Sequence, residues 1–300
     1  MKIGLLFASF LAMWVACGKR VETRPASPDA VTPSARVGLR GGAPCEGVTL
    51  ACGQFATPAA AMLAVLQDAP RVLAIGEAHA QKNATVASSA KRTQLQLLPE
   101  LKGRASDVLV ELMNPPSDCH KTTEAAREAH RPVTDKQASA DQNEYVALGA
   151  AARKLGIGAD LLRPSCEDLA AVADAGPAAV DESLKLIKRL TVARVVALLA
   201  QNASSPAGAD KMIVTYGGAL HNDAAPPPER AAWSFGPELS ERVHGRYLEL
   251  DVFVPEFIDD SAGWKRQPWF AEYDASKLGA KVTLFQTAPT SFTMVFAVGQ

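Results

Sequence analysis

Short apolar runs alternate along this chain with longer segments in which apolar residues recur at helical spacing. The runs are RVLAIG (71–76), DVLVEL (107–112), GIGADLL (156–162), MIVTYGG (212–218), YLELDVFV (247–254), and KVTLFQ and FTMVFAV near the end. Their short length and their Gly and Pro boundaries are typical of strands. The segments between them carry apolar residues three, four or eleven positions apart: Leu95, Leu98 and Leu101; Tyr145, Leu148, Ala152 and Leu155; and Leu184, Ile187, Val195 and Leu198.

This alternation predicts an α/β domain in which helices flank a central, mostly parallel sheet. The sequence has no internal repeat and no second set of boundaries, which predicts a single domain over residues 45–300. The composition agrees, since 48% of the 300 residues are hydrophobic and such a chain buries a large core. The net charge is only -1 and no basic run contains interleaved aromatic residues, so nucleic acid is not an expected partner.

The first sixteen residues, MKIGLLFASFLAMWVA, place one Lys before an apolar stretch that is too short for a stable membrane span. This pattern predicts a secretory signal peptide over residues 1–16. Cys17 follows Val15 and Ala16, which resembles a bacterial lipobox, although Trp14 stands where Leu is usual. We therefore expect lipidation of Cys17. A plain signal peptide cut after Gly18 and a chance apolar start are the alternatives.

Residues 17–44 are rich in Pro, Gly, Ser and Ala and have no apolar period, so we expect a flexible tether behind the lipidated Cys17. Such a tether suits a membrane-anchored lipoprotein of the bacterial cell envelope. Gly18 is not the Asp that retains lipoproteins at the inner membrane of enterobacteria. The expected location is therefore the outer membrane, facing the periplasm.

Four further cysteines, Cys45, Cys52, Cys119 and Cys166, are an even number in an exported chain and favour two disulfides. Three pairings are open, and buried free thiols are the alternative. We favour Cys45 with Cys52, which close a short loop, and Cys119 with Cys166, which follow the second and third strand runs. The spacing contains no CxxC pair, so a zinc site built from all four thiolates is disfavoured.

Acidic residues and histidines gather where three of the predicted strands end. Glu77 and His79 follow the first run, Glu111 lies near the end of the second, and His221 follows the fourth. The carboxyl ends of parallel strands meet at one edge of a sheet, where ligands bind, so we expect these four side chains to converge in one pocket. The single residue between Glu77 and His79 lets both side chains project to the same side of an extended backbone.

Carboxylates and imidazoles together serve two chemistries, which are general acid–base catalysis of hydrolysis and binding of a divalent metal ion that activates water. Each residue also has a structural alternative. Glu77 is then a helix cap, His79 a surface loop residue, Glu111 half of an ion pair, and His221 a partly buried histidine with satisfied hydrogen bonds. Their coincidence at three strand ends of one sheet favours the functional interpretation.

The same residues carry a resemblance to a known superfamily. The segments VLAIGEAHAQKNATVASSAKRTQLQLLPEL, SDVLVELM and, later, IVTYGGALHND resemble the group of erythromycin esterases, TraB/Tiki proteins and ChaN-like haem-uptake lipoproteins. The group's pattern is a strand ending in a Gly-Glu-x-His type motif, a helix, a second strand ending in Glu, and a later strand ending in Gly-x-x-His. The resemblance implies functional roles for Glu77, His79, Glu111 and His221, with Gly218 as the glycine of the last motif.

The resemblance covers residues 71–221 and has departures. Erythromycin esterases usually carry the His one residue further from the Glu, so the spacing of Glu77 and His79 is closer to the ChaN and Tiki branches. Relatives often place a polar site residue on the first helix, where this chain has Arg92 and Gln94; a solvated helix face explains either residue equally well. The haem ligands of ChaN-like proteins have no match here.

Motifs of other enzyme classes do not occur. The sequence contains no G-x-S-x-G elbow, no G-x-x-x-x-G-K-[ST] loop and no G-x-G-x-x-G fingerprint. The C-terminal part is rich in aromatic residues that we expect to pack in the core or on the surface, with an apolar pocket as the alternative. They are Trp233, Trp264, Trp269, Phe270 and Tyr273.

We therefore expect an exported lipoprotein in which Glu77 or Glu111 acts as general base on water, while His79 and His221 orient the water or hold a metal ion. The reaction is hydrolysis of an ester or peptide bond in a small-molecule or peptide ligand. The first alternative is a ChaN-like lipoprotein that captures haem or a metal complex without catalysis. The second is an envelope scaffold that keeps the fold without activity.

Replacing Cys17 with Ala is expected to release the protein from the membrane fraction, because the acyl chains on this residue are the predicted anchor. Fractionation of cells that express the parent and the Cys17→Ala variant measures this. A variant that stays in the membrane fraction as the parent does would show that Cys17 is not lipidated.

Overall fold

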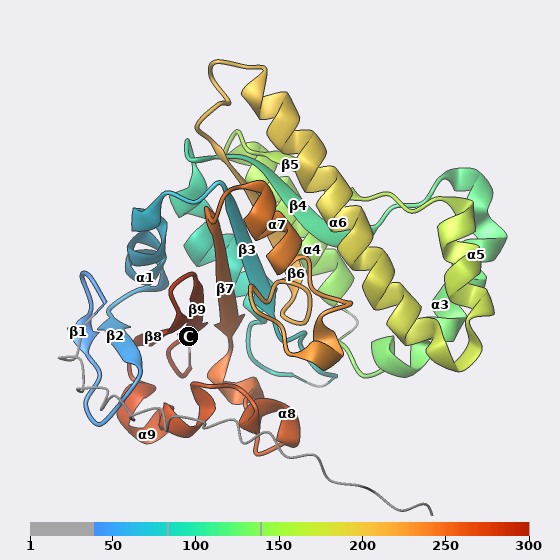
Figure 1. The fold of residues 1–300 in the computed structure, drawn as a ribbon. Coiled ribbons are helices and arrows are strands. Elements are labelled where there is room, and N and C mark those ends of the chain that lie inside the picture. The colour runs from blue at the N-terminus through green and yellow to red at the C-terminus, as the bar shows by residue number, and fades with distance from the viewer. Residues whose placement is uncertain (1–38, 83, 139, 300) are drawn as a thin grey trace, which may run out of the picture. The chain divides into compact units, whose positions relative to one another are not determined.

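The computed structural model describes residues 39–299, with the exception of positions 83 and 139. The predicted signal peptide, Cys17 and most of the predicted tether lie outside the described residues. The described residues belong to one compact unit, in which helices cover both faces of a nine-stranded sheet (Figure 1). The prediction of an α/β domain with a mostly parallel sheet is confirmed.

The strands follow one another in the sheet in the order β1-β2-β8-β9-β7-β3-β6-β4-β5. Strands β9, β7, β3, β6, β4 and β5 pair in parallel, whereas β1, β2 and β8 extend one edge with antiparallel pairs. Their bounds are β1 Ala43–Pro44, β2 Ala51–Phe55, β3 Val72–Glu77, β4 Ala105–Met113, β5 Gly158–Leu162, β6 Met212–Gly218, β7 Tyr247–Phe253, β8 Val282–Ala288 and β9 Ser291–Val295.

All seven predicted strand runs lie in this sheet, but β1 and β2 were not predicted. Strand β2 contains Gly53 and Gln54 and therefore shows no apolar run. Strand β1 falls within residues 17–44, the predicted tether, and pairs with β2. The folded part of the chain thus begins slightly before residue 45.

Strand β3 lies in the middle of the parallel region, and all six of its residues are buried. Leu73 and Ile75 belong to the core on one face of the sheet, and Val72 and Ala74 belong to the core on the other face. A strand covered on both faces needs apolar residues at successive positions, which explains the continuous run in the sequence.

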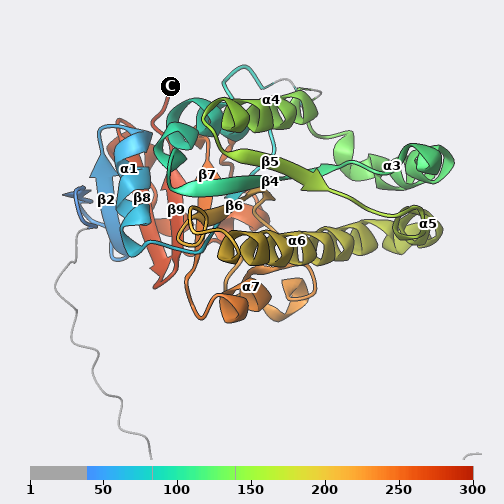
Figure 2. The same cartoon turned by 90° about the horizontal axis from the view of Figure 1, so that it is seen from above.

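The helices form two layers. Figure 2 shows α4 on one face of the sheet and α6 and α7 on the other, and α1 packs into the same core as α4. The predicted apolar faces of α4 and α6 pack on the sheet through Tyr145, Leu148, Ile187 and Val195. In the described residues the α-helices are α1 Pro58–Val65, α2 Ser89–Arg92, α3 His120–Thr134, α4 Asp141–Lys154, α5 Cys166–Asp174, α6 Ala179–Ala203, α7 Gly236–Arg242, α8 Ala262–Lys265 and α9 Ala275–Leu278.

The first predicted helix is interrupted. Helix α2 continues as a π-helical turn, η2 (Thr93–Leu97), and then as a 3-10 turn, η3 (Leu98–Leu101). The wider π turn changes the periodicity, so Leu95 is 58% exposed while Leu98 and Leu101 are buried. The expectation that Leu95 lies on a buried helix face is therefore wrong. Gln94, on the same π turn, is half-buried.

Arg92 does not lie on a solvated helix face, since it is only 2% exposed. Its Nε donates to the Ala87 carbonyl at 3.1 Å, its Nη1 donates to the Ala297 carbonyl at 3.3 Å, and its Nη2 lies 3.6 Å from the Glu256 carboxylate. The guanidinium also lies over the ring of Phe296. Burial lowers the pKa of Arg92, and the Glu256 charge opposes this shift. The solvated-face interpretation is wrong for Arg92, because this residue ties helix α2 to the C-terminal segment.

Of the five C-terminal aromatic residues, Trp269 packs in the core, and the other four are half-buried: Trp233, Trp264, Phe270 and Tyr273. Trp269 is fully buried, stacks on Phe253 and Phe285, and contacts Trp264 and Tyr273 edge-on. This cluster covers the sheet where the antiparallel strands join it. The disulfide between Cys45 and Cys52 belongs to the same cluster.

Helices α3 and α5 pack on each other beyond the carboxyl ends of β4 and β5 (Figure 2). The disulfide between Cys119 and Cys166 joins the starts of these two helices, so both predicted pairings are confirmed. Ser165 caps α5 by accepting from the Asp168 amide, and the Asp168 carboxylate accepts from the Ser165 amide in return. The disulfide and this cap fix the pair of helices next to the ends of the strands.

Replacing both Cys119 and Cys166 with Ser is expected to lower the free energy of unfolding by about 4 kcal/mol, because the bond closes a long loop in the unfolded chain. The matched control is the Cys45→Ser/Cys52→Ser pair, whose short loop predicts a loss of about 2 kcal/mol. Denaturant unfolding of the oxidised proteins measures both. A smaller loss for the long-loop pair than for the control would contradict the loop-entropy account.

Candidate functional site

Glu77 is the last residue of β3, and only 2% of its side chain is exposed. Both of its carboxylate oxygens accept hydrogen bonds. Oε1 accepts from the Tyr145 hydroxyl at 2.8 Å and from His79 Nδ1 at 3.1 Å, while Oε2 accepts from the Tyr216 hydroxyl. Buried carboxylates are stable only where such donors replace water. The Glu77 oxygens are therefore occupied by groups of the protein itself.

The two tyrosines come from different elements, Tyr145 from α4 and Tyr216 from β6, and meet edge-to-face with ring centroids 5.3 Å apart. Burial raises the pKa of both hydroxyls well above the usual value, and the charge of Glu77 adds to the shift. Both hydroxyls thus keep their protons at neutral pH. They act as permanent donors to Glu77.

His79 follows β3, and Glu77 positions its ring. Because a carboxylate only accepts, the His79 Nδ1 carries the proton of their hydrogen bond. Nε2, on the other side of the ring, lies 3.3 Å from the point that a Cβ on Gly218 would occupy. A carboxylate behind an imidazole fixes the tautomer and increases the basicity of the other nitrogen, as in metal sites and catalytic triads.

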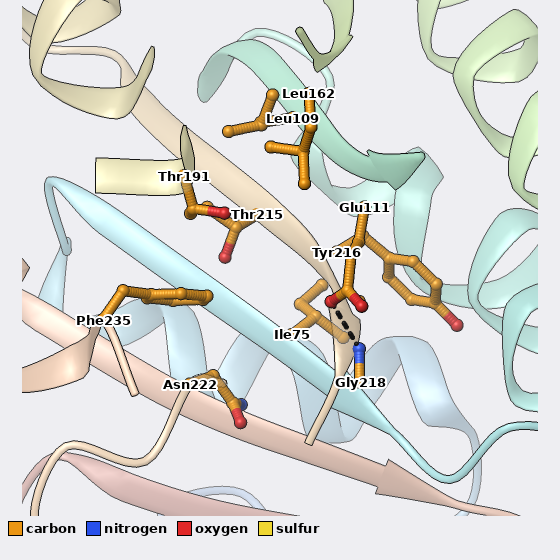
Figure 3. A pocket seen from close by; sticks show the side chains of 11 residues that line it. Ile75, Leu109, Glu111, Leu162, Thr191, Thr215, Tyr216, Gly218, Asn222 and Phe235 are labelled. Atoms are coloured by element: carbon orange, nitrogen blue, oxygen red, sulfur yellow. Dashed lines mark hydrogen bonds between the residues drawn. The ribbon is translucent and has the colours of Figure 1, made fainter. Parts of the chain in front are cut away.

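Glu111 and His221 form a second pair. Glu111 Oε2 accepts from the Gly218 amide at 2.9 Å (Figure 3), and Oε1 lies 3.7 Å from His221 Nε2. His221 is 3% exposed, and its Nδ1 lies 3.1 Å from the Trp233 carbonyl oxygen. A carbonyl only accepts, so Nδ1 carries the proton and Nε2 is turned toward Glu111.

The two pairs lie on opposite faces of the sheet edge. Side chains alternate between the two faces along a strand. Glu77 is in register with Gly218, and Val110 is in register with Tyr216. This register places the Glu77 side chain on the α4 side of the sheet and the Glu111 side chain on the α6 side. They approach each other because β6 ends there in two glycines. A Cβ on Gly217 would lie 2.0 Å from Glu111 Oε2, and a Cβ on Gly218 would lie within 4 Å of both His79 and His221.

The four predicted site residues are thus brought to one edge of the sheet, as two pairs separated by the backbone of β6. The pocket at this edge is lined by Glu111, Gly217 and Gly218 among others, whereas Glu77, His79 and His221 are not part of its lining. The prediction that the four side chains converge in a single pocket is therefore corrected: they lie as two pairs on opposite faces of the sheet edge. The physical reason is the alternation of the strand ends, which sends Glu77 and Glu111 to different faces.

His130 of α3 also belongs to this region, although sequence reasoning did not single it out. The segment after α3 pairs with the segment after His79, since the Ala138 amide donates to the Ala80 carbonyl at 2.7 Å. The His130 Nε2 atom is buried and has no hydrogen-bond partner among the described residues. Burial lowers the pKa of His130, Glu111 opposes this shift, and His79 adds to it. No sequence signal marks His130, because it lies in a polar helix away from any strand end.

Imidazoles and a carboxylate are ligands that a zinc-type ion prefers. The donors that face this edge are His79, His130, His221 and Glu111. Among the described residues, the only three ligand atoms within 4.8 Å of one another belong to Asp118, Cys119 and Cys166, and the two sulfurs there are bonded to each other. An ion shared by the site residues would therefore require their side chains to move closer together.

Acids with raised pKa values lie beside the site: Glu249 and Asp251 are buried on strand β7, and Asp223 is half-buried in the segment after β6. Burial raises the pKa of Glu249 to about 7, and it raises the pKa values of Asp251 and Asp223 above their usual range. Asn222 Nδ2 donates to Asp251 at 2.9 Å, and the Ser291 hydroxyl donates to Glu249 at 2.8 Å. Below about pH 7 the folded protein therefore holds a proton on Glu249 that an unfolded chain releases at a lower pH.

Comparisons of this chain with protein-family models, with curated proteins and with solved structures found no match. The superfamily resemblance accordingly depends on the quoted motifs alone. In the part of the chain that the structure describes, no helix has both the length and the apolar character needed to cross a membrane.

The free energy of unfolding is expected to fall by about 3 kcal/mol between about pH 5 and pH 8 through Glu249 alone. Its pKa of about 7 in the folded protein lies above the ordinary 4.5, so the folded state binds a proton that the unfolded state has already lost. Glu249→Gln should reduce this pH dependence and increase stability at the upper pH. Denaturant unfolding at both pH values measures it.

The control is Glu241→Gln, on the exposed surface of α7, whose free energy of unfolding should depend on pH as that of the parent does. If the free energy of unfolding of the Glu249→Gln variant also kept the parent's pH dependence, the raised pKa of Glu249 would be refuted.

Proposed function

We propose that this chain is a hydrolase of ester or peptide bonds that acts at the end of strand β6. One observation carries the proposal. Each of two imidazoles, His79 and His221, has its Nδ1 held by a fixed acceptor, which is Glu77 for the first and the Trp233 carbonyl for the second. Each ring therefore turns its Nε2 toward the glycine turn where Glu111 lies.

Glu111 is the better general base of the two candidate carboxylates. Its side chain is 16% exposed, and the Gly218 amide orients it through one oxygen, so water can approach the other. Glu77 is unsuited to this role, because three donors occupy its oxygens and its side chain is almost fully buried. Its role is instead to position His79.

His79 is suited to donate the proton to the leaving group, since the Glu77 carboxylate stabilises its imidazolium form. In the proposed reaction Glu111 takes a proton from water, and the water oxygen forms a bond to the carbonyl carbon. The bond to the leaving alcohol or amine then breaks as that group takes the Nε2 proton of His79. Loss of the proton from Glu111 to solvent and uptake of a proton by His79 from solvent then restore both groups.

The envelope location is part of the proposal. Two disulfides are typical of proteins that mature in an oxidising compartment, which supports export. Anchoring through a lipid on Cys17 would place the hydrolase at the membrane surface, where its ligand is a small molecule or a peptide.

The buried Nε2 atom of His130, which has no hydrogen-bond partner among the described residues, favours one variation, in which a divalent metal ion or haem is bound at the same edge. A metal ion would supply a water molecule of lowered pKa. Elemental analysis and an absorbance spectrum of protein purified without chelator separate the metal-dependent hydrolase, the haem-binding lipoprotein and the hydrolase that needs neither. A scaffold would bind neither group and hydrolyse nothing.

Glu111→Gln is expected to lower turnover by at least about a hundredfold, the usual contribution of a general base, while the fold stays intact. The assay uses a panel of short-chain nitrophenyl esters and fluorogenic peptides, with thermal melts of each protein. The matched control is Glu241→Gln, which should retain full activity.

Two results would contradict the proposal. One is a parent protein that hydrolyses no member of the panel. The other is a Glu111→Gln variant that keeps its turnover but loses about 1 kcal/mol or more of stability, as removal of one partner of a structural ion pair predicts.

A further inference from the structure

Three polar atoms form a closed triangle where strand β3 ends, and they belong to Glu77, His79 and Tyr145. The Tyr145 hydroxyl oxygen lies 2.8 Å from Glu77 Oε1 and 3.2 Å from His79 Nδ1. The third side, from His79 Nδ1 to Glu77 Oε1, measures 3.1 Å. Each atom is within hydrogen-bonding distance of the other two. Tyr145 therefore contacts the imidazole directly, in addition to the carboxylate.

The number of protons decides how this triangle is arranged. The carboxylate supplies none, the hydroxyl supplies one, and Nδ1 supplies one or none according to the tautomer of His79. Without a proton on Nδ1, a single proton would serve three contacts, and unshared lone pairs would face one another. With a proton on Nδ1, the hydroxyl donates to Oε1, and the Nδ1 proton is shared between Oε1 and the hydroxyl oxygen. All three contacts are then hydrogen bonds.

Tyr216 serves the same carboxylate in a different way. Its hydroxyl donates to Glu77 Oε2, whereas the bond to His79 uses Oε1. Both tyrosines are buried, at 4% exposure for Tyr145 and 1% for Tyr216. The pair thus offers a natural comparison, because either hydroxyl can be removed while the other still donates to Glu77.

Two acceptors on one side of the imidazole restrain both its tautomer and its rotation. The Nδ1–H group must point between Glu77 Oε1 and the Tyr145 oxygen. Nε2 then lies on the opposite side of the ring, 3.3 Å from the point that a Cβ on Gly218 would occupy. The triangle therefore sets the direction in which Nε2 faces the glycine turn.

We propose that Tyr145 is a positioning residue for His79. Its hydroxyl donates to Glu77 and accepts from His79 Nδ1, and the imidazole is thereby held in the tautomer and orientation that present Nε2 to the leaving group. This role rests on the proposed function, in which His79 protonates that group. Tyr145 acts on the reaction through His79.

The first test is neutron diffraction from crystals of the parent protein grown in heavy water, which shows the deuterium atoms directly. We expect a deuterium on His79 Nδ1 and a Tyr145 hydroxyl deuterium that points at Glu77 Oε1. A hydroxyl deuterium that points at His79 Nδ1 would overturn the proposal. This test needs no variant and no substrate.

The second test compares the parent with Tyr145→Phe on two esters of one acid, an ethyl ester and a nitrophenyl ester. Nitrophenolate leaves readily without a proton, whereas the ethyl ester depends on protonation by His79. Tyr145→Phe should lower kcat on the ethyl ester about tenfold, the effect of one lost positioning hydrogen bond, and should affect the nitrophenyl ester much less. KM should stay unchanged for both esters.

Tyr216→Phe is the matched comparison, because it removes a donor from Glu77 and leaves the triangle intact. It should keep the parent's ratio of the two kcat values, whatever it does to their size. Tyr273→Phe is the control for loss of a hydroxyl elsewhere, since that hydroxyl has no hydrogen-bond partner among the described residues, and both kcat values should equal those of the parent. Thermal melts establish that each variant is folded.

The two tests separate this proposal from the proposed function. A parent that hydrolyses neither ester but carries the expected deuterium atoms supports the positioning of His79 and refutes the hydrolase. A parent that hydrolyses both esters, with a Tyr145→Phe variant that keeps the parent's ratio of kcat values, leaves the hydrolase standing and overturns the role of Tyr145.

Discussion

The burial of one carboxylate, that of Glu77, is the constraint on which the rest of the site depends. Strand β3 carries this group into the core, where an ionised side chain is stable only if protein donors replace its water. The donors come from three elements, namely Tyr145 on α4, Tyr216 on β6 and His79 after β3. Meeting this requirement fixes α4 against the sheet and fixes the ring of His79. The burial of Glu77 thereby orients the imidazole of His79.

The second constraint on the site is that strand β6 ends in two glycines, Gly217 and Gly218, which have no side chains. Strand β6 separates the two carboxylate–imidazole pairs, and any Cβ on Gly217 would collide with Glu111. Glycine at this position lets the Glu111 carboxylate reach the Gly218 amide, which then holds it. At Gly218 the missing side chain leaves open the space between His79 and His221. The two glycines therefore let the pairs on the two faces approach each other at the end of β6.

Helix α3 joins the site through packing that no local sequence pattern encodes. The disulfide from Cys119 holds the start of this helix to α5, and backbone hydrogen bonds hold its far end to the loop after His79. His130 is fixed between these two attachments, close enough to Glu111 and His79 for their charges to act on it. The pocket beside Glu111 likewise depends on side chains from β4, β6 and the segment after β6.

The sequence by itself determined the strands of the parallel sheet, the apolar faces of α4 and α6, and the gathering of Glu77, His79, Glu111 and His221 at strand ends. These features follow from local periodicity and from the rule that parallel strands end at one edge. The sequence favoured the two disulfide pairings but left other pairings open, and the structure decided between them. Only the tertiary structure decided that the Glu77 oxygens accept hydrogen bonds from two tyrosines while Glu111 stays partly accessible. It also decided that Arg92 is buried and that a π turn exposes Leu95. The position of His130 beside the site likewise follows from the tertiary structure alone. The reason is physical: a pattern along one element shows which residues are buried, but the partner that satisfies a buried polar group comes from elements far away in the chain.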